Sequence, residues 1–237
     1  MTPDAARAAA LGRYSEVLEL TDGTTDPVLL LLRASALDRV GRLPEALDCC
    51  SAAIAAVPLE ADAWFVQGLV LYRFSEYEQA ATSLEQAGRL APGHAEALFV
   101  LGNVRYAQGR IEDAIACFES VVAIDPCHPK ALNNLGIALA DLGRYEEALG
   151  YFDRALAIIE SVPAVLLSRA ACLARLDRLR EAVEAFTRAL DIDPLNAGAW
   201  HDKGLAVARL GQDDEAKYCF SRGRALVDRQ GRSGMQS

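Results

Sequence analysis

The sequence has little of what a catalytic, nucleic-acid-binding or membrane-spanning protein needs. Its 237 residues include only three histidines, and 24 lysine and arginine residues are outnumbered by 33 acidic ones, for a formal net charge of −9. Nucleic acids and anionic membranes favour clustered positive charge, so this balance argues against affinity for either. No apolar run approaches the ~20 residues that span a bilayer, and Met1–Leu11 lacks the basic start of a secretory signal.

Metal-binding and redox motifs are also missing. The histidines His94, His128 and His201 are scattered, and Cys127 and His128 are adjacent rather than at a metal-ligand spacing. No glycine-rich phosphate-binding loop is present. We therefore predict a non-enzyme without metal or other cofactor. Five of the six cysteines lie in amphipathic helical patterns, which favours reduced thiols and a cytoplasmic location over a disulfide framework.

A period of 34 residues organises almost all of the chain. The segment Gly41-Arg42-Leu43-Pro44-Glu45-Ala46 has close copies at 109–114 and 143–148. Following the period gives six alanines in strict register: Ala46, Ala80, Ala114, Ala148, Ala182 and Ala216. Four residues after each alanine stands Cys50, Leu84 or a phenylalanine (Phe118, Phe152, Phe186 and Phe220), and twelve residues before it stands Ala34, Gly68, Gly102, Gly136, Ala170 or Gly204.

Each period contains two apolar stripes at helical spacing, separated by a turn residue, so each unit is predicted to be a helical hairpin. Small residues at the Gly68 and Ala80 positions allow the two helices to approach closely, and large residues such as Phe118 fill the space beside them. A hairpin of this kind cannot bury both of its faces alone, so the units must stack.

This arrangement resembles the tetratricopeptide repeat, which has a large residue, Gly or Ala, Ala, Phe, Ala and Pro at fixed offsets over 34 residues. The resemblance implies an all-α, right-handed superhelical solenoid of six helix-turn-helix hairpins with a degenerate N-terminal half-repeat. The predicted repeats are 27–60, 61–94, 95–128, 129–162, 163–196 and 197–230. Residues 1–26 are predicted to be degenerate capping helices and a loop, and residues 231–237 a flexible tail.

The resemblance also implies that the first helix of each hairpin lines a concave groove. The second, fifth, ninth, twelfth and thirteenth residues of each repeat are predicted to be exposed there, and the fourth, eighth and eleventh to point into the stack. Large apolar residues concentrate at the exposed offsets of the first three repeats, and we place the main peptide contact over repeats two to four. The predicted contact residues are Leu31, Phe65, Leu69, Tyr72, Phe99, Asn103, Tyr106, Asn133, Asn134 and Ile137. The alternative for Tyr72 and Tyr106 is packing between neighbouring hairpins.

One known use of such a groove is to clamp the C-terminal carboxylate of a chaperone. Asn103 and Asn134 stand at suitable offsets, but Phe99, Ala164 and Ser168 occupy the places of the basic residues, so the sequence argues against this use. The leading hypothesis is a non-catalytic scaffold or adaptor that binds a peptide or helix of a partner protein. The alternatives are a self-assembling module that forms homo-oligomers and a regulatory subunit of an enzyme complex.

Overall fold

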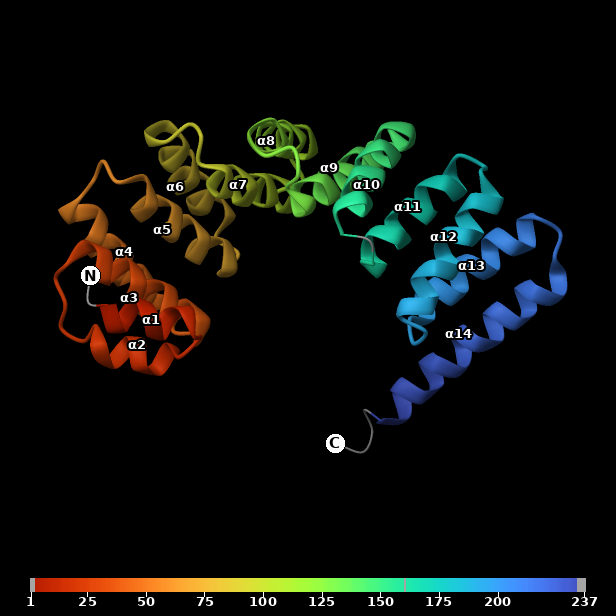
Figure 1. Cartoon of the computed structure of the whole chain (residues 1–237), viewed down its shortest axis with the longest axis horizontal. Helices are drawn as coiled ribbons and strands as arrows, with labels where there is room; N and C mark the ends of the chain where they lie inside the picture. The colour runs from red at the N-terminus through yellow and green to blue at the C-terminus, as the bar shows by residue number, and fades with distance from the viewer. Residues whose placement is uncertain (1–2, 160, 234–237) are drawn as a thin grey trace. The chain divides into compact units, whose positions relative to one another are not determined.

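The computed structural model describes residues 3–159 and 161–233, and every regular element in that part of the chain is an α-helix. The helices divide between Ile124 and Asp125 into two compact units. Within each unit they follow one another as antiparallel pairs (Figure 1). The all-α repeat prediction is therefore confirmed.

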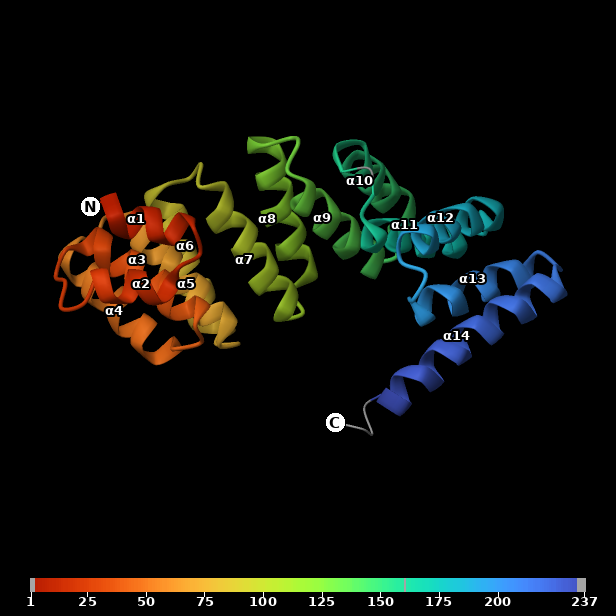
Figure 2. The ribbon, with the colours of Figure 1, turned by 60° about the horizontal axis from the view of Figure 1, so that its bottom comes forward.

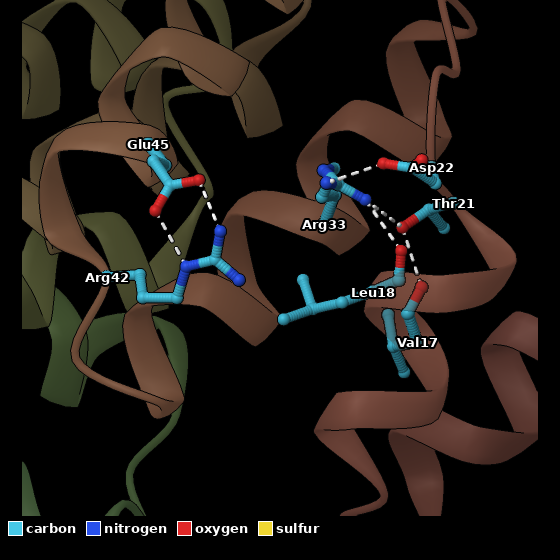
Figure 3. A network of polar contacts seen from close by, with 7 residues as sticks. All are labelled: Val17, Leu18, Thr21, Asp22, Arg33, Arg42 and Glu45. Carbon is cyan, nitrogen blue, oxygen red and sulfur yellow. Dashed lines mark hydrogen bonds and ion pairs between the residues drawn. The ribbon is translucent and has the colours of Figure 1, made fainter.

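The first unit contains eight helices among its described residues. Two short ones, α1 (Pro3–Ala10) and α2 (Tyr14–Leu20), precede three longer pairs: α3 (Pro27–Arg39) with α4 (Leu43–Ala56), α5 (Ala61–Arg73) with α6 (Tyr77–Leu90), and α7 (Ala95–Ala107) with α8 (Ile111–Ile124). Arg33 of α3 joins the short helices to the first long pair. Its guanidinium donates to the Leu18 carbonyl at 2.7 Å and to the Asp22 carboxylate at 3.1 Å (Figure 3).

The described part of the second unit contains three pairs: α9 (Pro129–Asp141) with α10 (Tyr145–Ile158), α11 (Pro163–Arg175) with α12 (Leu179–Ile192), and α13 (Ala197–Arg209) with α14 (Asp213–Ser233). Both ribbon views show α13 and α14 side by side (Figure 2). The second helix of every other long pair has 14 residues, whereas α14 has 21. It continues to Ser233, three residues into the predicted tail, and residues 234–237 lie outside the described part.

The turn inside each hairpin explains the recurring Gly-Arg motif. The residue at the glycine position has a positive φ in all six long pairs, and it is a glycine in four of them. Ser75 and Asp177 adopt the same left-handed conformation with φ of 62°, which costs a residue with a side chain more than it costs glycine. The arginine that follows the glycine pairs with a carboxylate three residues later, as Arg144 does with Glu147 at 2.7 Å.

Close approach of the two helices in a hairpin depends on the small residue of the first helix. A Cβ atom added at Gly136 would lie 2.6 Å from the Phe152 ring, and one at Gly102 would lie 2.5 Å from the Phe118 ring. Phe118 and Phe152 are fully buried as a result. The glycine and phenylalanine positions thus form one packing unit inside each hairpin.

Candidate functional site

Within each unit the first helices of neighbouring hairpins contact one another: α3, α5 and α7 in the first unit, and α9, α11 and α13 in the second. We call the face that these first helices turn away from their second helices the inner surface of the unit. Two of the three inward-pointing offsets are buried throughout, the eighth and the eleventh: Ala34, Gly68, Gly102, Gly136, Ala170 and Gly204, and Leu37, Leu71, Arg105, Leu139, Leu173 and Val207. At the fourth offset Leu30, Leu132 and Leu166 are buried, whereas Trp64, Leu98 and Trp200 are half-buried. The second and thirteenth offsets are exposed in all six hairpins.

The predicted contact residues of the first unit are more buried than the sequence analysis expected. Six are half-buried and Tyr106 is 36% exposed; the six are Leu31, Phe65, Leu69, Tyr72, Phe99 and Asn103. Phe65, Leu69, Tyr72 and Phe99 pack against a single cluster of core residues that includes Leu84 and Val104. The structure therefore brings these four together as a layer over the core.

Ring contacts explain the partial burial of the aromatic residues. The Phe65 ring lies 4.8 Å from the His94 ring, the Tyr72 ring 6.1 Å from the Tyr77 ring, and the Phe99 ring 6.0 Å from the Phe118 ring, measured between centroids. For Tyr72 this is packing between side chains of one hairpin. These side chains fill the inner surface of the first unit themselves.

Asp38 corrects one part of the offset rule. It stands at a twelfth offset, where exposure was expected, but its side chain is only 6% exposed. Arg73 of the next hairpin reaches back and donates to Asp38 Oδ2 at 2.9 Å, which offsets the cost of burying the carboxylate. The expectation was wrong because it did not allow for a partner one repeat later.

In the second unit, the predicted residues Asn133, Asn134 and Ile137 all lie half-buried on α9. Asn133 donates from Nδ2 to Asn134 Oδ1 at 3.2 Å, so the two amides contact each other. Ile137 instead borders a hollow between α9 and α11. The three residues therefore lie on one helix, and Ile137 is the one that lines open space.

Two adjoining hollows lie on the inner surface of the second unit. The first has a volume of about 360 Å³ and is bordered by Ile137, Ala140, Asp141, Tyr145, Phe152, Ser168, Ala171, Cys172 and Arg175. The second, of about 640 Å³, is bordered by Ala171, Ala174, Arg175, Phe186, Asp202, Leu205, Ala206, Ala208 and Arg209. Ala171 and Arg175 border both, and we call the pair the alanine hollows.

Small residues border the alanine hollows at the twelfth offset of α9, α11 and α13 and at the ninth offset of α11. Ala171 stands where α5 has Leu69, and Ala174 stands where α5 has Tyr72. The main contact was predicted over repeats two to four because large apolar residues concentrate at the exposed offsets of the first three repeats. Four alanines at groove offsets, Ala140, Ala171, Ala174 and Ala208, were the signal that could have located the hollows.

The contacts and burial of the histidines and cysteines indicate structural roles. His94 and His128 cap helices, since their Nδ1 atoms accept from the backbone N–H of Ala97 and Ala131 at 3.2 and 3.0 Å. Burial raises the pKa of Cys50 to about 12 and that of Cys172 to about 11, which keeps both thiols protonated and poorly nucleophilic at neutral pH. Among the described residues, no group of His, Cys, Asp and Glu side chains could hold a metal ion.

The described helices include none that combines the length and the apolar character needed to cross a membrane. A sequence comparison with curated proteins finds no match.

Solved structures share the fold. YrrB, described as a TPR protein with an unusual peptide-binding site, is 23% identical, with a TM-score of 0.68 over 75% of this chain and 91% of YrrB. MamA (residues 41 to the end) from Desulfovibrio magneticus RS-1 is 20% identical, with a TM-score of 0.70 over 72% of this chain and 96% of that one. PilF of Pseudomonas aeruginosa is 19% identical, with a TM-score of 0.71 over 81% and 88%. At these identities the likeness establishes the fold alone.

The sequence itself identifies the family. The tetratricopeptide repeat profile matches residues 31–95, 67–129, 99–163 and 167–219, which together span most of the chain. The matched segments contain the positive-φ turns and the glycine–phenylalanine contacts described above. The chain therefore belongs to the tetratricopeptide repeat family.

Proposed function

We propose that this protein is a non-catalytic scaffold or adaptor that holds a peptide or helical segment of another protein on its inner surface. Membership of the tetratricopeptide repeat family supports a role in protein interaction. The six cysteines are free, which is consistent with a reducing compartment such as the cytoplasm.

The alanine hollows are the observation that carries the proposal. Open volumes of about 360 and 640 Å³ adjoin at Ala171, and pockets of several hundred Å³ with mostly apolar walls are typical of ligand sites. The bulky side chains of a bound segment would replace the large residues that the repeat lacks there. In the first unit we propose an accessory contribution from the exposed edges of the predicted residues, with Tyr106 the most accessible of them.

Substitution of Ala171 tests the proposal directly. Ala171 is exposed and borders both hollows, so Ala171→Leu should fill them without disturbing the core. Ala157→Leu on α10 is the matched control, because Ala157 is also exposed and borders neither hollow. Peptides selected on the full chain from a random-peptide library should lose most of their affinity for Ala171→Leu and keep it for Ala157→Leu. Equal affinity for both variants would contradict the proposal.

A second candidate, self-association, is favoured by the end of the second unit. A hollow of about 630 Å³ is bordered by Ala197, Gly198, His201, Phe220, Gly223, Arg224 and Val227. Phe220 is half-buried there, whereas Phe118, Phe152 and Phe186 are buried, and Val227 is 57% exposed. Light scattering over a range of concentrations tests this candidate: a mass that stays at one protomer would eliminate it.

A further inference from the structure

Arginines recur at the thirteenth offset of the first helices, and two of them bind a carboxylate. Arg39, Arg73, Arg175 and Arg209 each end the first helix of a hairpin at this offset. Arg73 donates to the Asp38 carboxylate at 2.9 Å. Arg209 donates to the Asp177 carboxylate at 2.8 Å and to the Ala174 carbonyl at 2.9 Å. In both cases the acceptors come from the preceding hairpin.

Arg39 and Arg175 have no such carboxylate partner among the described residues, and of the two it is Arg175 that borders the alanine hollows. The positions that supply Asp38 and Asp177 are taken by Ala140 and Gly143 in the hairpin before Arg175, so that hairpin offers no carboxylate at either place. No ion pair or hydrogen bond joins Arg175 to another described residue, although the side chain borders both alanine hollows. Arg175 is thus a cation at the junction of the two hollows.

Two acidic residues border the hollows, and neither forms an ion pair with Arg175. Asp141 borders the first hollow and has an interaction of its own. Asp202 borders the second hollow from α13, seven residues before the Arg209 offset. Seven residues of helix correspond to about 10 Å along the axis, so Asp202 lies well towards the other end of the hollow. The positive end of the hollows is therefore at Arg175.

We infer that the alanine hollows select acidic, hydrophobic segments: bulky apolar side chains enter the hollows while the side-chain carboxylate of an Asp or Glu binds the Arg175 guanidinium. The inference rests on the proposed function and gives it a ligand chemistry. A carboxylate would occupy the place that Asp177 fills beside Arg209, with the charge-assisted geometry that guanidinium groups favour. The apolar residues beside Arg175, such as Ala171 and Ala174, would contact the bulky side chains that flank the carboxylate.

The test uses the full chain and a peptide from the random-peptide library whose affinity depends on Ala171. Fluorescence anisotropy compares this peptide with copies in which each Asp or Glu in turn is replaced by its amide. One neutralisation should weaken binding by at least about tenfold, as expected for a hydrogen bond to a charged group. Arg175→Gln should remove that difference, whereas the control Asp202→Asn should leave it unchanged or enlarge it.

The outcomes separate the two proposals. If library peptides bind, Ala171→Leu blocks them, and neither the neutralised peptides nor Arg175→Gln changes the affinity, the acidic preference is wrong and the peptide site stands. If Ala171→Leu leaves binding unchanged, or no peptide is selected, both proposals are contradicted. Arg175 is exposed, so circular dichroism of Arg175→Gln should match that of the native chain.

Discussion

The two units are built from the same kind of hairpin, but their inner surfaces carry side chains of different size. Leu69 and Tyr72 on α5 correspond to Ala171 and Ala174 on α11. In the first unit the large side chains lie half-buried against the core, and in the second the small ones border open volumes. The comparison of α5 with α11 shows that the same backbone can carry large side chains over its core or small ones beside open space, depending on the residues at the ninth and twelfth offsets.

This difference changes how such a surface should be interpreted. An aromatic residue at a groove offset contributes to binding only if its own hairpin does not already bury it, and the rings of Phe65, Tyr72 and Phe99 each have a neighbouring ring within about 6 Å. Alanine contributes no interface area of its own but leaves room for a partner. If the comparison is correct, substitutions at equivalent offsets should affect stability in the first unit and binding in the second.

The largest effect on stability is expected for Phe99→Ala. Phe99 packs against the core cluster and the Phe118 ring, and removal of a half-buried ring of this kind should lower the free energy of unfolding by about 2 kcal/mol. Leu205→Ala on α13 is the control, since Leu205 is 48% exposed and should change stability by less than about 1 kcal/mol. Urea unfolding followed by circular dichroism measures both. Equal shifts of the urea unfolding midpoint in the two variants would contradict the proposed difference between the inner surfaces of the two units.

An exchange at the ninth offset should give a smaller effect of the same kind. Leu69→Ala creates in the first unit the small residue of the second, and should cost about 1–2 kcal/mol because Leu69 packs against the core cluster. Ala171→Leu performs the reverse change at an exposed position and should alter stability by less than about 0.5 kcal/mol. Thermal unfolding of the two variants compares them, and a larger loss for Ala171→Leu would show that the hollows are not free space.

The smallest difference is expected between the buried thiols of the two units. Burial raises the pKa of Cys50 to about 12 and of Cys172 to about 11, so both should resist alkylation at pH 8 while the exposed Cys127 reacts. Mass spectrometry of the labelled peptides measures this. Rapid labelling of Cys172 alone would mean that the first hollow opens into the core.

The same thiols predict a dependence of stability on alkaline pH. Their folded pKa values lie above the ordinary value of 9.0, so the unfolded chain loses these protons first as pH rises. The stabilising contribution is complete below pH 9 and is lost as the pH rises towards about 11–12. Unfolding midpoints at several alkaline pH values test the sign.

Much of the fold follows from the 34-residue pattern alone. The six first helices begin at residues 27, 61, 95, 129, 163 and 197, each the first residue of a predicted repeat. This agreement has a local cause: a turn residue with positive φ joins the two helices of each hairpin, and in four of the six an arginine after it pairs with a carboxylate three residues later. Burial at the eighth and eleventh offsets follows from the same periodicity.

The candidate site was harder to predict because it depends on pairs of hairpins. Burial of Asp38 requires Arg73 from the next repeat, and Arg175 lacks a partner because Ala140 and Gly143 of the previous repeat replace the carboxylates found at these places elsewhere. The length of α14 was missed: Asp228 stands where Pro58, Pro92, Pro126 and Pro194 close other repeats, so the helix is free to continue past this position. Exposure predicted from a residue's position within one repeat does not take contacts between repeats into account.

The tight contact between glycine and phenylalanine has an evolutionary consequence. Gly136 and Phe152 lie in the same hairpin, as do Gly102 and Phe118, so a break between hairpins never separates the two halves of this contact. Whole 34-residue blocks can therefore be duplicated, deleted or shuffled in the gene without leaving either partner alone. A lineage could assemble a new specificity by moving a hollow-bearing block next to a filled one.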